Sequence, residues 1–434
     1  MKISFIGTGY VGLVSGVMMS HIGHDVVCID VDELKITKLH QGSCPIFEPG
    51  LDEYISKYGN SNKLKFVCGY DESISGSDCL FITVGTPPKE NGDADLSGVF
   101  ECLESATSYI SSKCIIVMKS TVPPGTCAKV SEFLRSKGLG NSVVSNPEFL
   151  REGDAIKDFL EPDRIVIGAD NDESFAVMRK VYEPLTKEGV IVVETDLNTS
   201  ELIKYASNTF LANKIAFINE MADLCEAVGA DISKLSHGIG LDKRIGSAFL
   251  QAGPGFGGSC FPKDIMALQQ LSKNIDSDFL ILDAVITANS NRPQIMLNKI
   301  ARAIGGDIAN KRLAVLGLTY KAGTDDLRSS PAIELINKLR EQNADIITYD
   351  PEGMKNADHY FDNLNCAKNI YEAIENSDAI IIITEWQEFK DIDLKKARDI
   401  VNQPVIIDLR NIIDSKYAQD SGFKYYSVGR KSGK

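Results

Sequence analysis

Short apolar runs alternate with longer stretches of mixed polarity through the first 195 residues of the chain. The runs are five to seven residues long and occupy residues 2–7, 25–30, 79–85, 114–120, 142–148 and 164–168. Nearly continuous apolar runs are typical of buried parallel strands, and the stretches between them carry helical periodicity or turn residues. This alternation predicts a doubly wound α/β domain that ends near residue 195.

The pattern changes after this point. Residues 199–228 contain neither glycine nor proline, and Gly229 follows them. Thr199 suits the N-cap of a helix and Gly229 suits its C-terminal stop. We therefore expect one helix of about 30 residues, roughly 45 Å long at 1.5 Å per residue, with further helical pieces to about residue 305.

The last third of the chain repeats the pattern of the first. Residues 313–320 resemble 3–10, residues 344–351 resemble 24–31, and residues 378–386 resemble 78–86. Such an internal repeat predicts a second Rossmann-like domain, and its first turn lacks the full glycine set, so its ligand should not be a dinucleotide. The final residues, 429–434, are expected to form a frayed basic tail.

These patterns define the expected fold class and its parts. The class is α/β, with two Rossmann-like doubly wound domains joined by a long central helix and a small helical domain. The expected divisions are residues 1–195, 196–305 and 306–434.

The charge balance narrows the range of partners. The net charge is −14, which argues against nucleic acid or an anionic membrane as the main partner. No apolar run approaches the roughly 20 residues of a membrane helix. The first 19 residues are not read as a signal peptide, because their glycines fall at fixed spacing and Asp30 follows.

Ten cysteines are scattered along the chain. They form no C-x-x-C pair and no histidine cluster accompanies them, so neither a zinc site nor any other metal site is expected. Their scatter favours reduced thiols in a cytoplasmic protein over a disulfide framework. We expect nine of them to be small buried apolar side chains.

The segment "GTGYVG", residues 7–12, carries the first chemical signal. It follows a predicted strand and opens a predicted helix, and Asp30 ends the next strand. Gly7 would make the tight turn, Gly9 would let the backbone approach a pyrophosphate, and Gly12 would let helix and sheet pack closely. Asp30 would accept hydrogen bonds from ribose hydroxyls, which favours NAD over NADP.

A second signal lies in "GPGFGGSCFPKD", residues 253–264. Pro262 suits the first position of a helix, which would place Cys260 beside the helix N-terminus. The helix dipole and Lys263 would lower the pKa of the thiol, and glycines 255, 257 and 258 would leave room for a substrate to reach it. The alternative is a buried structural cysteine in a glycine-rich loop.

Two further groups of polar residues are candidates for chemistry. Lys204 and Asn208 share one face of the long helix and suit donation to an oxyanion, although such residues on a helix are usually only solvated. Glu148 and Glu152 follow a strand of the first domain, at the edge where ligands of open sheets bind. They are candidate acid/base or ribose-contacting groups, or else solvated loop carboxylates.

All of these features occur in one order along the chain, and in this the sequence resembles the UDP-glucose/GDP-mannose dehydrogenase family over essentially its whole length. Members with N-acetylated substrates typically carry a histidine just before the cysteine, where this chain has Ser259. With "DKRIGSAFLQAG", this position resembles the branch that acts on UDP-glucose. GDP-mannose or another nucleotide sugar is the alternative substrate.

The resemblance implies an NAD-dependent oxidation of UDP-glucose to UDP-glucuronate, in two steps that use two NAD and one water. Cys260 would attack the intermediate aldehyde to give a thiohemiacetal, and a second oxidation would leave a thioester. Lys204 and Asn208 would stabilise the oxyanions. Asp264 would orient or activate water, and Glu148 would serve in thioester hydrolysis.

The resemblance also implies binding residues. The residues matched to NAD contacts are Gly7, Gly9, Val11, Gly12, Asp30, Lys35, Thr86, Thr121, Glu152, Lys263 and Arg328. Thr121 would bind cofactor or a catalytic water. The residues matched to UDP-sugar contacts are Glu148, Phe149, Leu150, Arg151, Glu152, Lys204, Asn208, Arg244, Phe249, Leu250, Gln251, Ala252, Gly253, Gly257 and Lys321. Arg244 would reach substrate from the neighbouring subunit of a homodimer built through the central helical domain.

Two other classes of protein compete with this interpretation. A two-electron dehydrogenase of the 3-hydroxyacid type also pairs a Rossmann domain with a helical one, but it needs neither this cysteine nor a third domain. A nucleotide-sensing or structural protein would keep "GTGYVG" without requiring Lys204, Asn208 and Cys260 together.

Overall fold

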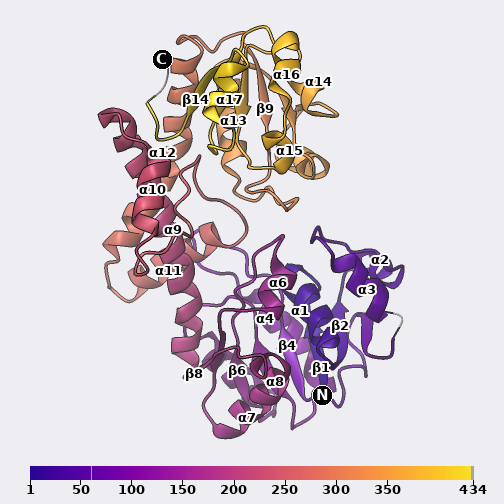
Figure 1. The fold of residues 1–434 in the computed structure, drawn as a ribbon. Coiled ribbons are helices and arrows are strands. Elements are labelled where there is room, and N and C mark those ends of the chain that lie inside the picture. The colour runs from indigo at the N-terminus through magenta and orange to yellow at the C-terminus, as the bar shows by residue number, and fades with distance from the viewer. Residues whose placement is uncertain (60, 432–434) are drawn as a thin grey trace. The chain divides into compact units, whose positions relative to one another are not determined.

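The computed structural model describes residues 1–59 and 61–431, and these fold into two compact units. The first unit contains residues 1–207 and 266–276, and the second contains residues 208–265 and 277–434. Two helices, α9 (Leu197–Val228) and α11 (Phe261–Asn274), run from one unit into the other (Figure 1). No helix of the described ranges is long and apolar enough to cross a membrane.

The first unit is built on an eight-stranded sheet of order β3-β2-β1-β4-β5-β6-β7-β8. In chain order the strands are β1 (Lys2–Ile6), β2 (Asp25–Asp30), β3 (Leu64–Cys68), β4 (Cys79–Ile82), β5 (Ile115–Met118), β6 (Val143–Ser145), β7 (Ile165–Gly168) and β8 (Val192–Thr195). The first six follow the Rossmann order 3-2-1-4-5-6, which agrees with the predicted doubly wound domain, although no predicted run corresponds to β3. Strand β7 was expected to be parallel as well, but it pairs with β6 antiparallel through Ser145 and Gly168.

Helices cover both faces of this sheet. They are α1 (Tyr10–His21), α2 (Glu33–His40), α3 (Leu51–Gly59), α4 (Ser97–Ala106), α5 (Thr126–Ser136), α6 (Ala155–Leu160), α7 (Asp172–Val181) and α8 (Glu183–Thr186), with a 3-10 turn η1 (Thr107–Tyr109). Side chains of α1, α3 and α6 share one buried core with β1, and those of α4 and α5 share another with β4 and β5. Burial of both faces explains the continuous apolar runs.

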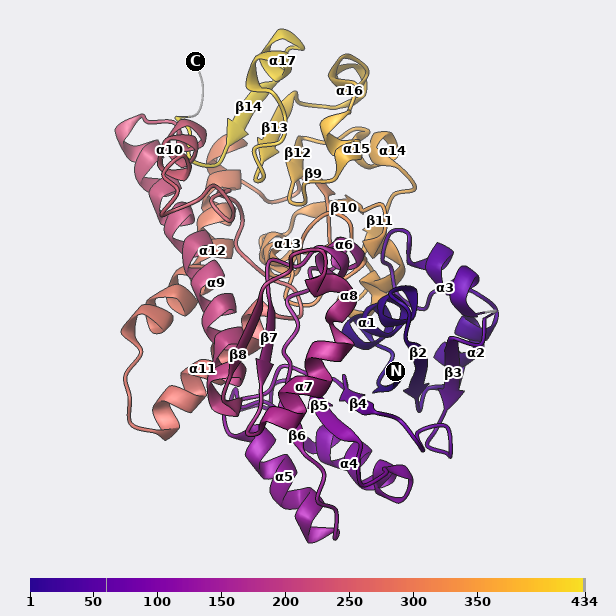
Figure 2. The same cartoon turned by 60° about the horizontal axis from the view of Figure 1, so that its bottom comes forward.

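The second unit repeats this plan with six strands in the order β11-β10-β9-β12-β13-β14 (Figure 2). The strands are β9 (Arg312–Leu316), β10 (Asp345–Tyr349), β11 (Asn365–Cys366), β12 (Ala379–Ile382), β13 (Val405–Asp408) and β14 (Lys424–Ser427). Every pair in this sheet is parallel. The order is again 3-2-1-4-5-6, so the internal repeat predicted from the sequence is confirmed as a second Rossmann-like sheet.

The helices of the second unit complete two further cores. They are α10 (Ile232–Gly240), α12 (Leu280–Ala303), α13 (Pro331–Glu341), α14 (Ile370–Ile374), α15 (Gln387–Lys390), α16 (Leu394–Ile400) and α17 (Ser415–Asp420), with a 3-10 segment η2 (Gly353–His359). Side chains of α12 and α13 pack on one face of the sheet, and those of α14, α15 and α16 pack on the other.

The long helix α9 has 32 residues, as the glycine-free stretch predicts. It begins three residues before the expected start, because Asp196 rather than Thr199 caps it. The Asp196 carboxylate accepts the Thr199 backbone N–H at 2.8 Å and the Thr199 hydroxyl at 2.6 Å. Gly229 has φ +76° and ends the helix, as expected of a glycine at this position.

Two other sequence-based expectations are wrong in part. Of the nine cysteines expected to be buried, Cys44 is half-buried and Cys68 and Cys366 are exposed, the last two because they lie on the edge strands β3 and β11. The tail is not frayed at its start. The Arg430 guanidinium donates to Asp231 at 3.3 Å and to Ser233 at 2.6 Å, whereas residues 432–434 of the predicted tail lie outside the described range.

Candidate active site

The glycine turn between β1 and α1 has the geometry that a dinucleotide site needs. Gly7 has φ +100°, and a Cβ there would lie 2.9 Å from the Thr83 carbonyl oxygen. A Cβ on Gly12 would lie 1.9 Å from the Gly7 oxygen, so helix and turn pack too closely for any side chain. A Cβ on Gly9 meets nothing within 4 Å. The turn therefore leaves open space at Gly9, in front of the α1 N-terminus, where a phosphate would bind.

Asp30 lies beside this turn at the end of β2. Its carboxylate accepts the backbone N–H and the hydroxyl of Thr8, both at 2.7 Å, and the N–H of Asp32 at 3.0 Å. Lys35 Nζ lies 3.9 Å away. Burial alone would raise the pKa of Asp30, but these hydrogen bonds outweigh it and the pKa is lowered. The carboxylate is therefore ionised at neutral pH and one-tenth exposed, which suits it to accept from a ribose hydroxyl.

The predicted catalytic residues are divided between the two units. Glu148, Lys204 and Thr121 belong to the first unit, and Asn208, Cys260 and Asp264 belong to the second. Lys204 and Asn208 are one turn apart on α9, as expected from their spacing, and both are buried rather than solvated.

In the first unit, Lys204 and Glu148 form a buried ion pair. Nζ lies 3.0 Å from Oε1, and both side chains are 4% exposed. The other carboxylate oxygen of Glu148 accepts the Leu150 backbone N–H at 2.5 Å. Burial would raise the pKa of Glu148, but Lys204 outweighs it, so the pKa is lowered and the group is ionised.

A second buried cation, Lys119, belongs to the same cluster and was missed by the sequence analysis. Its Nζ donates to Asn146 Oδ1 at 3.3 Å and to the Tyr182 hydroxyl at 3.4 Å. Burial lowers the pKa of Lys119 to about 8, with Glu148 raising it and Lys204 lowering it further. Its position one residue after β5, at the carboxyl edge of the sheet, was the signal that could have identified it.

Phe149 contacts two cations through its ring. Arg164 stacks over its ring at 3.4 Å from the centroid, and Lys204 Nζ lies 5.3 Å from the same centroid. These cation–π contacts fix the ring and the lysine together.

The remaining predicted residues of the first unit lie in different settings. The Thr86 hydroxyl donates to the Thr121 carbonyl at 2.8 Å, so these two residues are held together. Glu152 is buried, whereas the Arg151 guanidinium binds Asp158 at the surface, with Nη2 to Oδ1 2.6 Å.

In the second unit, Asp264 joins three of the predicted residues. The Asn208 amide donates to its Oδ2 at 2.6 Å, and Lys263 Nζ lies 2.5 Å from its Oδ1. The side chain of Asp264 is 1% exposed, and its backbone N–H donates to the Cys260 carbonyl at 3.0 Å. This last bond places Cys260 at the N-cap of α11, with Pro262 at the second helical position rather than the first.

Cys260 is partly exposed, and its sulfur lies 3.5 Å from the Ser259 hydroxyl. An N-cap thiol faces the positive end of the helix, and Lys263 is in the first turn. Cysteine acts as a nucleophile in its thiolate form.

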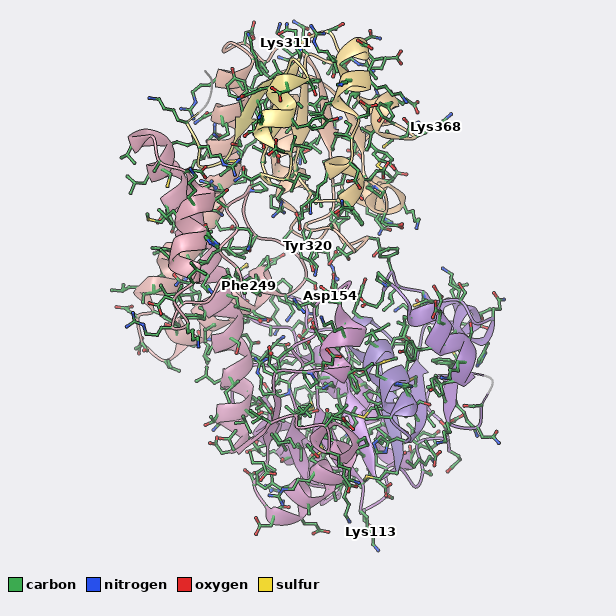
Figure 3. The ribbon with its side chains drawn as sticks, viewed as in Figure 1. Lys113, Asp154, Phe249, Lys311, Tyr320 and Lys368 are labelled. Carbon is green, nitrogen blue, oxygen red and sulfur yellow. The ribbon has the colours of Figure 1, made fainter. Side chains whose placement is uncertain are left out.

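The glycines around Cys260 serve packing rather than substrate access. A Cβ on Gly257 would lie 2.1 Å from the Ser329 carbonyl oxygen, and one on Gly258 would lie 2.8 Å from the Tyr320 ring. Gly258 also donates its N–H to the Arg328 carbonyl at 2.9 Å. The expectation that these glycines leave room for a substrate is therefore wrong at Gly257 and Gly258. Their missing side chains let the loop pack against residues 320–330, where Figure 3 labels Tyr320.

The other predicted substrate residues of the second unit are spread over several elements. Phe249 (labelled in Figure 3) has φ +63°, and the centroid of its ring lies 6.1 Å from the centroid of the Phe261 ring. Leu250 and Ala252 are buried, and Gln251 is exposed. Arg244 is 89% exposed, with Nη2 2.7 Å from Asp242.

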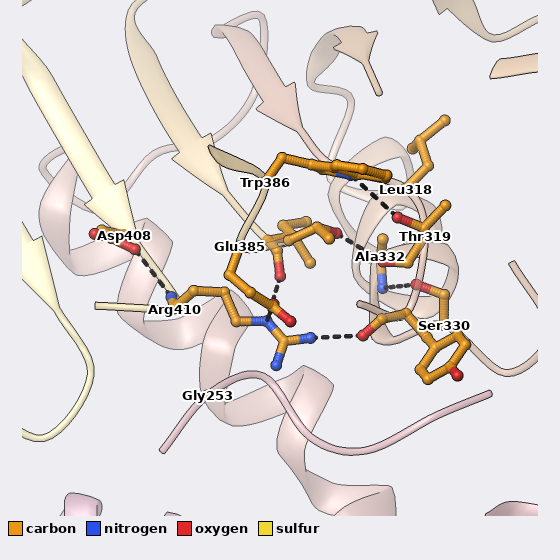
Figure 4. Close-up of polar contacts among 12 residues, drawn as sticks. Gly253, Leu318, Thr319, Ser330, Ala332, Glu385, Trp386, Asp408 and Arg410 are labelled. Atoms are coloured by element: carbon orange, nitrogen blue, oxygen red, sulfur yellow. Dashed lines mark hydrogen bonds and ion pairs between the residues drawn. The ribbon is translucent and has the colours of Figure 1, made fainter. Parts of the chain in front are cut away.

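The turn after β9 carries Lys321, whose Nζ lies 5.8 Å from the centroid of the Tyr320 ring. Arg328 binds Asp326, with Nη2 2.8 Å from Oδ2. The same turn is held by Arg410, which the sequence analysis missed although it follows β13 closely. Its guanidinium donates to the Tyr320 carbonyl at 2.8 Å and to the Ile383 carbonyl at 2.7 Å, and it lies 3.1 Å from Glu385 (Figure 4).

Comparison with known proteins agrees with this architecture. Residues 1–186 match the NAD binding domain of the UDP-glucose/GDP-mannose dehydrogenase family, residues 198–291 its central domain and residues 314–415 its UDP binding domain. A UDP-glucose 6-dehydrogenase of Rickettsia bellii is 54% identical over 99% of this chain and the whole of that protein.

Two solved structures have the same fold over nearly the whole chain. A UDP-glucose dehydrogenase from Pyrobaculum islandicum superposes with a TM-score of 0.91 at 34% identity, covering 99% of this chain and 98% of that one. A UDP-D-ManNAc dehydrogenase from Pyrococcus horikoshii superposes with a TM-score of 0.87 at 27% identity, covering 99% of each chain.

The fold and the nucleotide turn define an NAD-dependent oxidoreductase with two Rossmann-like halves. The chain belongs to the UDP-glucose/GDP-mannose dehydrogenase family.

Proposed function

We propose that this protein oxidises UDP-glucose to UDP-glucuronate, with two NAD and one water consumed per sugar. The observation that carries this proposal is Cys260 at the N-cap of α11, four residues before a buried Asp264 that Asn208 holds. The relative from Rickettsia bellii, named a UDP-glucose 6-dehydrogenase, supports the choice of substrate. Ser259, in place of a histidine before the cysteine, supports it further.

The residues of the first unit fit a bound NAD. The open space at Gly9 and the N-terminus of α1 would receive the pyrophosphate, and the ionised Asp30 would accept from the adenosine ribose. The bound nicotinamide supplies a hydride acceptor for each of the two oxidations.

Residues of this chain would carry out the other steps of the reaction at the C6 carbon of the sugar. The first oxidation converts the C6 alcohol to an aldehyde, losing one hydride and one proton. The Cys260 thiolate then adds to the aldehyde carbon, and Lys204 and Asn208 donate to the oxyanion that forms. A second hydride leaves the thiohemiacetal and gives a thioester.

Hydrolysis of the thioester completes the reaction. Water adds to the thioester carbon, and the C–S bond breaks to return the thiolate and release the carboxylate. Asp264, held by Asn208 and Lys263, would orient this water, and Glu148 would accept its proton. The remaining roles stay as predicted, with Thr121 at the cofactor or a catalytic water, and Arg244 reaching substrate from a neighbouring subunit.

The quaternary state and location belong to the same proposal. We infer a homodimer through α9, because Phe210, Phe217 and Leu224 recur at seven-residue spacing and are 64%, 49% and 52% exposed. Phe217→Glu should then shift the mass measured by sedimentation from two chains to one. We also infer a cytoplasmic location, which suits a chain with ten cysteines, and three functional parts at residues 1–195, 196–305 and 306–434.

The proposal is tested by counting NADH per sugar in a limiting-substrate assay. Formation of two NADH per UDP-glucose supports the proposal. Formation of one NADH indicates a two-electron dehydrogenase, and formation of no NADH contradicts both of these functions. UDP-glucose should be turned over well ahead of GDP-mannose and UDP-N-acetylmannosamine. If GDP-mannose or UDP-N-acetylmannosamine were turned over as fast as UDP-glucose, the assignment of UDP-glucose as the substrate would be wrong.

A further inference from the structure

The loop that carries Cys260 is fixed at its backbone by side chains that the predicted site does not include. Asn289 of α12 accepts the Phe256 backbone N–H at 2.9 Å and donates to the Phe256 carbonyl at 3.2 Å. One side-chain amide therefore satisfies both backbone groups of a loop residue, as a neighbouring strand would. Phe256 is only four residues before the thiol.

Gly253 is held in the same way at the start of the loop. Asn219 of α9 accepts its N–H at 2.8 Å, and Arg292 Nε donates to its carbonyl at 3.1 Å. Arg292 is 2% exposed, and its Nη1 lies 2.6 Å from Asp223. The ion pair with Asp223 thus holds the guanidinium that donates to the loop.

The loop sequence explains why such fixing is needed. Residues 253–260 include four glycines, and glycine loses more conformational entropy on ordering than any other residue. Gly255, with φ +120°, also permits the contact, because a Cβ there would lie 2.9 Å from Asn289 Oδ1. Asn289 can therefore approach the loop only because residue 255 is glycine. Its hydrogen bonds from α12 restrict the loop backbone, which the glycine-rich sequence alone would leave flexible.

We propose that Asn289 is a positioning residue for Cys260, assisted by Asn219 and Arg292. It acts through the Phe256 peptide, whereas the next two loop residues, Gly257 and Gly258, contact residues 320–330 instead. Its catalytic consequence rests on the proposed function, because a thiol must be held close to its target carbon to react well.

The proposal is tested on the full chain with Asn289→Ala, and with Asn291→Ala as the matched control. Asn291 is exposed on the same helix two residues away. Loosening the loop should speed alkylation of Cys260 by iodoacetamide at least about fivefold, as followed by mass spectrometry of its peptide. Cys366, exposed on β11 of the same unit, is the internal reference. In the same variant, kcat for UDP-glucuronate formation should fall about 10- to 100-fold, with KM changed less than about threefold.

The two readouts separate this proposal from the proposed function. If the parent protein does not oxidise UDP-glucose, the proposed function fails, and alkylation alone decides whether Asn289 positions the thiol. Alkylation of Cys260 equal to that in Asn291→Ala overturns the proposal, and so does an unchanged kcat in an active enzyme. Should Asn289→Ala prove insoluble, Asn289→Asp makes the same test, since it keeps the acceptor and removes the donor to Phe256.

Discussion

Asp30 and Asp350 occupy the same position in the two Rossmann-like halves, but their carboxylates have different partners. Each follows the residue whose carbonyl binds the first glycine of its turn, Ile29 for Gly7 and Tyr349 for Gly317. Asp30 accepts three hydrogen bonds and is one-tenth exposed.

Asp350 is 1% exposed and its carboxylate accepts six hydrogen bonds. The donors are the N–H groups of Leu318, Thr319, Glu352 and Gly353, the Thr319 hydroxyl and the Trp386 indole. Figure 4 shows Trp386 beside the Thr319 turn. A carboxylate has about four lone-pair sites, so Asp350 has no capacity left for a ribose. The second half therefore uses this position for structure, whereas the Asp30 carboxylate of the first half keeps capacity for a further donor.

Asp30→Ala should weaken NAD binding by about tenfold or more, because it removes a charged acceptor of a ribose hydroxyl. It should also narrow the preference for NAD over NADP, since the carboxylate repels a 2′-phosphate. Calorimetric titration with both cofactors measures the two effects. Equal use of NADP by the unmutated protein would contradict the assignment.

Asp350→Asn should leave NAD affinity unchanged and lower the free energy of unfolding of the second unit. Asparagine cannot accept all six hydrogen bonds, and buried donors are left without partners, so the cost should be about 2–4 kcal/mol. Urea unfolding measures it. Trp386 is the only tryptophan in the sequence, so its emission reports on this contact directly. A loss below about 0.5 kcal/mol would show that the network is not a stabilising one.

Cys260→Ser should nearly abolish UDP-glucuronate formation while UDP-glucose and NAD still bind. A hydroxyl has a far higher pKa than a thiol, so the α11 N-terminus cannot make it a comparable nucleophile near neutral pH. Some of the first oxidation, or a trapped ester, can persist. Calorimetry measures binding and chromatography measures product on the same variant. If Cys260→Ser formed nearly as much UDP-glucuronate as the parent protein, Cys260 would have a structural role and not a covalent one.

Lys119→Met should stabilise the first unit at pH 7, and this gain should shrink as pH rises from 8 to 10. The pKa of Lys119 is about 8 in the folded protein, below the value near 10.4 of a free lysine, because the ammonium is buried. Between these values the unfolded chain binds more protons than the folded one, so the stability of the parent protein rises with pH. Below pH 8 the buried charge costs about 3 kcal/mol, which methionine removes.

Urea unfolding of both proteins at pH 7, 8, 9 and 10 makes this measurement. Lys113→Met is the control, since Lys113 is exposed (Figure 3) and its replacement removes no buried charge. If the difference in free energy of unfolding between Lys119→Met and the parent protein did not change with pH, the ammonium group of Lys119 would not be desolvated in solution.

The sequence alone determined the two Rossmann-like halves, the long helix and the nucleotide turn. Each of these depends on local patterns: apolar runs buried on both faces, a stretch of about 30 residues without glycine or proline, and glycines at fixed spacing. Strand β3 was missed because its alternating burial makes the apolar signal weaker. The antiparallel pairing of β6 and β7 was missed because an apolar run does not indicate strand direction.

Only the tertiary structure decided which polar side chains act together. Glu148 and Lys204 are 56 positions apart, as are Asn208 and Asp264, and Asn289 meets Phe256 across 33 positions. Asp30 ends β2 and Asp350 directly follows β10, and only the neighbours that the fold brings to each leave one carboxylate with capacity for a further donor and saturate the other. A residue type shows what bonds a side chain can form, whereas the packed surroundings determine which partners remain and whether burial raises or lowers its pKa.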